Sequence, residues 1–298
     1  AGSDAVVMQE LCAHADGEVA INHLPHPGEW ITRRGADIAR DAGLLDAGTR
    51  LRPQDIGLAA SVGMARLPVF RRLRVALFST GDELVMPGEP LPEGAIYNSN
   101  RYTLRGLLQC LGCEIQDLGI VPDSLDATRA ALRQAAARND LILTSGGVSV
   151  GEEDHVRPAV LAEGALDLWK IAIKPGKPLA YGRVGAAAFI GLPGNPVSSF
   201  VTFVVLVRPF VLRCQGARVA PLAGQSRIAG FDWSKPDVRR EFLRCRLAGD
   251  GTLEPYANQS SAVLASTAWA DGLVDNPPGH AILRGDAVRF LPFSELLF

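Results

Sequence analysis

Between residues 73 and 216 the chain alternates short apolar runs with amphipathic stretches, and this rhythm restricts the possible folds more than any other feature. Residues 75–78 and 141–144 are almost entirely apolar, as expected of strands that are buried on both faces. Residues 102–111 and the alanine-rich stretch 125–138 carry apolar side chains at helical spacing. Because strands that alternate with helices form βαβ units, we predict an α/β domain of three layers with a mostly parallel sheet.

The rhythm stops on both sides of this segment. Residues 1–72 contain short apolar runs, such as 6–8, that we interpret as strands between turns. After Gly216, alternating stretches such as residues 240–247 lie between turns rich in glycine and proline. We therefore predict a mainly β segment at the N-terminus and a small all-β domain at the C-terminus, a sandwich or barrel.

Charge and hydropathy argue against several classes of function. The chain has 30 Lys and Arg against 32 Asp and Glu, and its net charge of −2 is unlike that of proteins that bind nucleic acid or anionic membranes. The most apolar stretch, residues 197–207, is interrupted by two serines and a threonine and is shorter than the roughly 20 residues of a membrane-spanning helix. No signal peptide is recognisable. We predict neither a nucleic-acid nor a membrane partner.

The cysteines indicate a reducing compartment. There are 5 of them, an odd number at scattered positions, so we predict a cytoplasmic protein. Cys110 and Cys113 form a C-x-x-C pair, but Gly112 between them is typical of a helix end. Since no second pair or nearby histidine completes a zinc site, we interpret this spacing as chance.

Two acidic residues lie in the loop that directly follows the predicted strand at 75–78. They are Asp82 and Glu83, within the stretch Ser-Thr-Gly-Asp-Glu-Leu at 79–84. Carboxylates at a strand end can hold Mg²⁺, which prefers oxygen ligands. Asp and Gly are also common turn formers, so a surface turn with solvated acids is the alternative.

A glycine-rich loop follows the predicted strand at 141–144. Gly146 and Gly147 allow backbone N–H groups to converge on an anion, and Ser145 adds a hydroxyl donor. Asp154 is placed to cap the next helix, whose N-terminus would favour a phosphate. Turns need glycine as well, so a loop without a ligand is the alternative.

Two further motifs combine a fixed backbone with groups that suit an anion. Lys170, Lys174 and Lys177 lie within eight positions, where two prolines and a glycine restrict the backbone. Fixed positive charge suits an oxyanion or a polyphosphate, and a solvated basic face is the alternative. The stretch Gly-Leu-Pro-Gly-Asn-Pro-Val-Ser at 191–198 places Pro196 in the first turn of a long helix. Free N–H groups there would form a second anion site, unless the stretch is only a rigid turn.

In this order, the four motifs resemble those of the molybdopterin molybdenumtransferase family, which includes bacterial MoeA and the E domain of gephyrin. The resemblance extends over almost the whole chain, with residues 4–10 and 34–38 similar to the family's second domain and residues 239–242 and 258–261 to its C-terminal β domain. It implies four parts: remnants of the second domain at 1–41 and of a linker or dimerisation domain at 42–72, a molybdopterin-binding α/β domain at 73–221, and a C-terminal β domain at 222–298.

The resemblance also implies a reaction, in which adenylylated molybdopterin and molybdate give molybdenum cofactor and AMP. A metal must polarise the phosphoanhydride of that substrate. The family's acids for Mg²⁺ are matched by Glu83, Asp123 and Asp37. The pterin's phosphate would fit the loop at Ser145, Gly146 and Gly147, while Asp154 would accept hydrogen bonds from the pterin ring.

The remaining roles follow from the same resemblance. Positions that the family uses for molybdate are matched by Lys174, Lys177, Ser198, Arg239 and Ser261. Pro193 and Pro196 belong to the cofactor-binding set, and Lys170 lies beside the adenylylated substrate. The implied catalytic set is Glu83, Asp123, Asp154, Lys170 and Lys174.

The chain departs from the family pattern at three places. Ala36 stands where the family usually has glutamate, and Asn98 where it usually has aspartate, so the metal ligands are matched less completely. The chain opens Ala-Gly-Ser-Asp, without the family's N-terminal stretch, so we expect an N-terminally truncated member. For the full-length form we expect a homodimer that is supplied by an upstream molybdopterin adenylyltransferase.

Two alternatives remain from other classes. A pterin-binding protein of the adenylyltransferase type shares the Ser-Gly-Gly loop but normally lacks flanking β domains, so the segments around Arg239 and Ser261 argue against it. A non-catalytic scaffold of the gephyrin type is the second alternative, and the retained acids and lysines favour catalysis over it.

Overall fold

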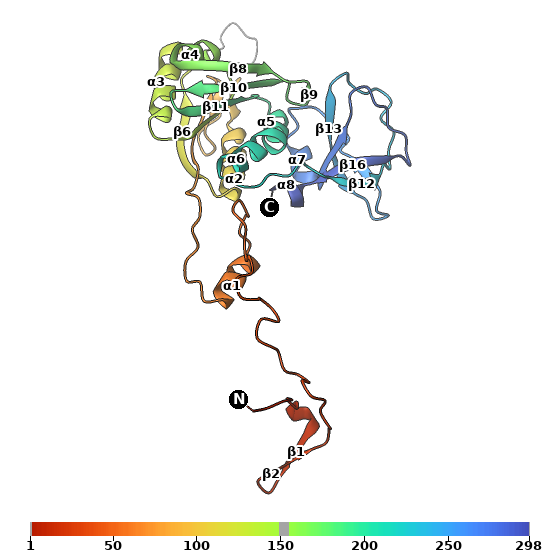
Figure 1. Ribbon diagram of the computed structural model, residues 1–298. Coiled ribbons are helices and arrows are strands. Elements are labelled where there is room, and N and C mark those ends of the chain that lie inside the picture. Colours follow the sequence, from red (N-terminus) through yellow and green to blue (C-terminus); the bar gives the residue numbers. More distant parts are fainter. Residues whose placement is uncertain (1, 149–154, 298) are drawn as a thin grey trace. The chain divides into compact units, whose positions relative to one another are not determined.

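The computed structural model describes residues 2–148 and 155–297, and its backbone divides into two compact units, residues 1–67 and 68–298 (Figure 1). The finer division into four parts stays a prediction. The fold class is confirmed: a three-layer α/β core is followed by a β-rich segment.

The first unit contains one hairpin and one helix. Strands β1 (Cys12–Ala15) and β2 (Glu18–Ile21) pair around Asp16 and Gly17, which both have positive φ as a tight hairpin turn requires. Residues 6–8, expected as a strand, form none, and the 3-10 turn η1 (Gln9–Leu11) follows them. Helix α1 (Pro53–Ser61) was not expected, although its first turn carries Pro53 and the capping acid Asp55.

The second unit is built on a six-stranded sheet in the order β6-β3-β7-β11-β10-β8. Its first four members run parallel to one another, and β10 is antiparallel both to β11 and to the edge strand β8. The sheet is therefore mixed at one edge, where the sequence predicted no strands. In sheet order the strands are β6 (Glu114–Val121), β3 (Arg74–Thr80), β7 (Leu141–Ser145), β11 (Ala187–Leu192), β10 (Pro178–Val184) and β8 (Gly164–Lys170).

Helices cover both faces of this sheet, as predicted. Along β3, Val75 and Leu77 pack with one set of helices, while Ala76 and Phe78 pack with the other, because successive side chains of a strand point to opposite faces. The first face carries α2 (Ser99–Cys110) and a long helix made of α5 (Pro196–Thr202), η2 (Phe203–Val207) and α6 (Arg208–Cys214). The second face carries α3 (Leu125–Ala136) and α4 (Val156–Glu163).

The long helix Pro196–Cys214 is the one helix in the described part of the chain that is long and apolar enough to cross a membrane, with 19 residues and a mean hydropathy of 1.7. Of its most apolar stretch of 18 residues, 61% is buried inside the unit. Val201, Val204 and Val211 on this helix are fully buried in the core against the sheet. Its apolar character is therefore explained by packing.

A second sheet follows, in the order β12-β16-β15-β13-β14, with antiparallel pairing throughout. A two-residue strand of the α/β part, β9 (Ile173–Lys174), adds to it in parallel, opposite Arg240 and Glu241 of β13. This seam joins the two parts of the second unit (Figure 1). The remaining elements are β4 (Leu84–Val85), β5 (Ile96–Tyr97), β12 (Gln225–Ile228), β13 (Arg240–Leu247), β14 (Leu253–Pro255), α7 (Ala265–Trp269), β15 (Gly272–Asn276), β16 (Ala287–Pro292) and α8 (Phe293–Leu297).

Candidate functional site

Three loops meet at the carboxyl edge of the parallel strands. The hydroxyls of Ser79 and Ser145, at the ends of β3 and β7, lie 3.1 Å apart. The N–H of Gly146 donates to the carbonyl at the end of β11 at 3.1 Å. Asn100 in the first turn of α2 donates through Nδ2 to the carbonyl of Gly194 at 2.7 Å. Ligands of parallel α/β sheets bind at this edge, so the structure brings the predicted loop motifs to a suitable place.

Neither of the paired glycines could carry a side chain without a clash. Gly146 and Gly147 both have positive φ, and a Cβ on Gly146 would lie 2.4 Å from the carbonyl oxygen of Thr80. A Cβ on Gly147 would lie 2.7 Å from Oγ1 of Thr80. That hydroxyl is buried and has no hydrogen-bond partner in the described structure. A buried hydroxyl costs free energy unless it is satisfied, so Thr80, which sequence reasoning missed, is suited to a polar ligand in this loop.

Asp154, predicted to cap a helix and to bind the pterin, lies outside the described residues. Helix α4 begins at Val156, and the side chain of His155 makes no capping hydrogen bond to it.

The predicted metal acids lie at one edge of the sheet, with one exception. Register between β3 and β6 places Thr80 opposite Val121, so the loops with Glu83 and Asp123 follow neighbouring strand ends. The N–H of Asp123 donates to Oδ1 of Asp82 at 3.2 Å, which brings these two loops into contact. Among residues 2–148 and 155–297 no cluster of three His, Cys, Asp or Glu side chains could hold a metal. Asp37 belongs to the first unit.

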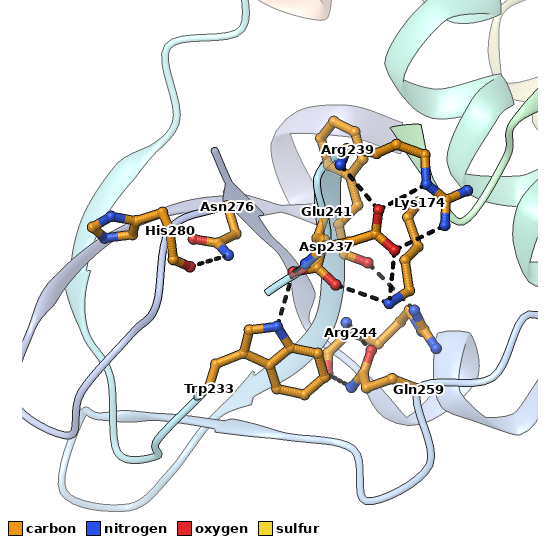
Figure 2. A network of polar contacts seen from close by, with 10 residues as sticks. Lys174, Trp233, Asp237, Arg239, Glu241, Arg244, Gln259, Asn276 and His280 are labelled. Carbon is orange, nitrogen blue, oxygen red and sulfur yellow. Dashed lines mark hydrogen bonds and ion pairs between the residues drawn. The ribbon is translucent and has the colours of Figure 1, made fainter. Parts of the chain in front are cut away.

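A second group of predicted residues gathers at the seam between β9 and β13 (Figure 2). Nζ of Lys174 lies 3.3 Å from Oδ2 of Asp237 and 3.2 Å from Oε1 of Glu241. Arg239 donates to the two oxygens of Asp237 through Nε and Nη2, both at 2.9 Å. The structure therefore brings Lys174 and Arg239, 65 positions apart in the chain, to the same carboxylate.

Sequence reasoning missed both acids of this group. Asp237, Arg239 and Glu241 stand at every second position up to the start of β13, a spacing that in a strand places side chains on one face and could have revealed them. Hydrogen bonds from Arg239, and a weaker one from Lys174, hold the pKa of Asp237 well below its usual range. Asp237 in turn raises the pKa of Arg239.

Glu241 is almost completely buried, with 1% of its side chain exposed. Its Oε2 accepts hydrogen bonds from Nε1 of Trp233 at 2.9 Å and from the N–H of Asp237 at 3.1 Å (Figure 2). Its other oxygen pairs with Lys174. Two hydrogen bonds to Oε2 and an ion pair at Oε1 therefore hold this carboxylate, although Oε1 itself accepts no hydrogen bond among the described residues.

The other predicted anion-binding residues lie around the start of α5. The N–H of Val197, next to Ser198, donates to the carbonyl of Ser261 at 3.0 Å, so the helix start is closed by the C-terminal segment and its N–H groups are not all free. A Cβ on Gly176 would lie 2.4 Å from Oγ1 of Thr202, which shows how closely the lysine turn packs on α5. Pro193 is buried, Pro196 begins α5, and Lys170 and Lys177 are exposed at the ends that pair β8 with β10.

A buried arginine supports the loop that carries Ser261. The guanidinium of Arg244 donates to the carbonyl of Ser260 at 3.2 Å and to Oγ of Ser266 at 3.2 Å. Gln259 makes two hydrogen bonds with the backbone of Arg244, both at 2.9 Å. This loop is therefore held from β13.

Comparisons with known proteins give matches along most of the chain. Family models match residues 1–63 ("MoeA N-terminal region (domain I and II)"), 76–213 ("Probable molybdopterin binding domain") and 227–293 ("MoeA C-terminal region (domain IV)"). The molybdopterin molybdenumtransferase of Haemophilus influenzae is 45% identical over 304 residues, which covers 99% of this chain and 75% of the relative. Molybdopterin molybdenumtransferase 2 of Mycobacterium tuberculosis is 35% identical, over 93% of this chain and 70% of the relative.

Solved structures agree with these matches. A molybdopterin biosynthesis MoeA protein from Pyrococcus horikoshii superimposes with a TM-score of 0.78 at 32% identity. The superposition covers 97% of this chain and 72% of that one.

Proposed function

The chain belongs to the molybdopterin molybdenumtransferase family, and from this premise we propose that it inserts molybdate into adenylylated molybdopterin with release of AMP. The observation that carries the proposal for the site is the convergence of Lys174 and Arg239 at the seam between β9 and β13. Fixed donors from two parts of the chain can replace the hydration of a compact dianion. The two lysines of the turn, Ser198, Arg239 and Ser261 would together bind molybdate.

We propose that the pterin end of the substrate lies at the carboxyl edge of the sheet. The N–H of Gly147 would receive its phosphate, because the positive φ of both glycines forms a turn of the kind that presents backbone N–H groups to an anion, and the N–H of Gly146 is already bonded to the carbonyl of Leu192. The unsatisfied hydroxyl of Thr80 supplies a further donor there. Ser145, which shares a hydrogen bond with Ser79, would complete this loop.

Mg²⁺ fits the acids at the same edge. Mg²⁺ in phosphate-transfer sites is usually held by one or two carboxylates together with substrate phosphate oxygens, so a cluster of three protein acids is not required. The contact between the loops of Asp82 and Asp123, with Glu83 adjacent, provides oxygen ligands of this kind. We propose that Glu83 and Asp123 hold the ion, which would neutralise charge on the phosphoanhydride. The assignment of Asp37 rests on the resemblance alone.

The alternatives receive less support from the same findings. The matches at 1–63 and 227–293 lie outside the pterin-binding domain, whereas a protein of the adenylyltransferase type normally consists of that domain alone. A scaffold without catalysis would not need the anion-binding lysines or the acids at the sheet edge. We further propose a cytoplasmic homodimer that takes its substrate from a molybdopterin adenylyltransferase.

The molybdate site can be tested by alanine substitution. Lys177→Ala and Arg239→Ala should each raise the molybdate concentration for half-maximal turnover by roughly 10- to 150-fold, since a charge-assisted hydrogen bond contributes about 1.5–3 kcal/mol. Binding of the adenylylated pterin should change much less. Arg246→Ala is the matched control, because Arg246 lies on β13 but pairs with the exposed Glu254. If the variants lost pterin binding but kept the native dependence on molybdate, both residues would belong to the pterin site and not to the molybdate site.

A further inference from the structure

The cations proposed for molybdate are already paired with carboxylates. Lys174 and Arg239 carry two positive charges, and Asp237 and Glu241, which contact them, carry two negative charges. The group is therefore electrically neutral before any anion arrives. A dianion that enters this place meets paired charges instead of two free cations.

Asp237 occupies the donors that an oxyanion would use. Its carboxylate accepts the N–H of Arg239 at 3.0 Å, both Nε and Nη2 of the same residue at 2.9 Å, and lies 3.3 Å from Nζ of Lys174. The Nε–Nη2 edge of a guanidinium is an edge that binds carboxylates and oxyanions through two hydrogen bonds. In this structure that edge of Arg239 is taken by a residue of the chain itself.

The two carboxylates differ in freedom. Glu241 lies within β13, is 1% exposed and is fixed by Trp233 and by the backbone of Asp237. Asp237 precedes the strand, is 19% exposed, and its carboxylate contacts only the two cations and the N–H of Arg239 among the described residues (Figure 2). A side chain in that position can rotate away when a competing anion binds, whereas Glu241 cannot.

We propose that Asp237 is an internal competitor of the oxyanion substrate, which holds Lys174 and Arg239 in place while the site is empty and weakens anion binding by its own charge. The inference rests on the proposed function, because it takes these two cations as molybdate ligands. If Asp237 moves away, its hydrogen bonds are lost when the anion binds. If it stays, its charge repels the dianion. In both cases the acid lowers the affinity of the site for molybdate, tungstate and sulfate alike.

The test is equilibrium titration of molybdate into the purified chain by calorimetry, without the pterin substrate. Asp237→Asn removes the charge and keeps the shape, and should lower the Kd for molybdate by roughly 5- to 30-fold, as expected when one negative charge beside a dianion near a protein surface is removed. The Kd values for sulfate and tungstate should fall by a similar factor. Glu254→Gln, which removes one negative charge from the same sheet at an exposed pair, should leave the Kd unchanged.

A Kd that is unchanged or raised in Asp237→Asn overturns the proposal, because Asp237 would then only position the cations. A thermal unfolding curve shows whether Asp237→Asn is folded. If that variant does not fold, Asp237→Ser is titrated in its place. Failure of the proposed function is recognised separately: in that case Arg239→Ala in the otherwise native chain would not affect molybdate binding. The increase in molybdate affinity caused by Asp237→Asn should also disappear when Arg239→Ala is added to the same chain.

Discussion

Replacement of Arg244 by methionine should cost little stability, although Arg244 is the largest fully buried side chain of the described structure. Its guanidinium has no carboxylate partner among the ion pairs of residues 2–148 and 155–297, and burial lowers its pKa from 12.5 to about 10. A fall of that size corresponds to a desolvation cost of about 3 kcal/mol. Methionine would remove this cost and fill most of the volume.

Against this gain stand three hydrogen bonds, from the guanidinium to Ser266 Oγ, the carbonyl of Phe242 and the carbonyl of Ser260, at 3.2, 3.3 and 3.2 Å. Bonds as long as these lie at the lower end of the charged range, about 1.5 kcal/mol each, or roughly 4–5 kcal/mol together. The two effects nearly cancel, so Arg244→Met should destabilise the protein by only about 1 kcal/mol. Arg244→Ala leaves a cavity as well and should cost about 3–5 kcal/mol.

Urea unfolding followed by tryptophan fluorescence measures both variants, and molybdate titration measures the loop that carries Ser261. We expect the methionine variant to unfold almost like the native chain yet to bind molybdate several-fold more weakly, because Ser260 loses its support. A loss of more than about 4 kcal/mol in Arg244→Met would refute the reasoning, since it would mean that the hydrogen bonds far outweigh the desolvation cost.

Three further predictions concern the ion pairs, the glycine loop and the metal. Hydrogen bonds from Arg71, and then from the backbone and side chain of Arg74, hold the pKa of Asp140 below its ordinary 3.8, so its stabilisation is present above about pH 4 and is lost as the pH falls below that value. Asp140→Asn should thus lower stability at pH 7 by about 1 kcal/mol and flatten the acid side of the stability profile, as measured by urea unfolding from pH 2 to 7. Gly146→Ala should abolish binding of adenylylated pterin in a direct titration while the chain stays folded, because the new Cβ would lie 2.4 Å from the carbonyl of Thr80 at a backbone φ of 90°. Retained affinity would place the substrate elsewhere. Removal of Mg²⁺ by a chelator, or Glu83→Gln, should stop AMP release but leave molybdate binding intact, and unchanged turnover in Glu83→Gln would remove that residue from the metal site.

The central part of the fold was predictable because its signals are local. Apolar runs and helical spacing each depend on a few neighbouring residues, and the helices expected at 102–111 and 125–138 occur at Ser99–Cys110 and Leu125–Ala136. Strand β8 was missed because it lies at the sheet edge with mostly exposed or half-buried residues, so it lacks an apolar run. Helix α1 was missed because its weakly apolar residues show little helical periodicity.

The candidate site was predictable only in part, for a related reason. The lysine turn and the glycine loop are visible as short motifs, and the resemblance supplied their roles. The partners of Lys174 depend on the pairing of β9 with β13, between residues more than 60 positions apart. No local pattern around Lys174 indicates Asp237 or Glu241, so their contact became visible only in three dimensions.

The seam between β9 and β13 also has a thermodynamic consequence. Only two residue pairs, Ile173 with Arg240 and Lys174 with Glu241, form its backbone ladder, and the proposed molybdate ligands come from both sides of it. An anion bound to both sides acts as a cross-link, and its binding free energy adds to the free energy that keeps the two sides together. At a concentration of 100 times its Kd, molybdate would add about 2.7 kcal/mol to the free energy of association of the two sides. With molybdate bound as proposed, substrate loading and the docking of the C-terminal sheet would be a single coupled equilibrium, in which each strengthens the other to the same extent.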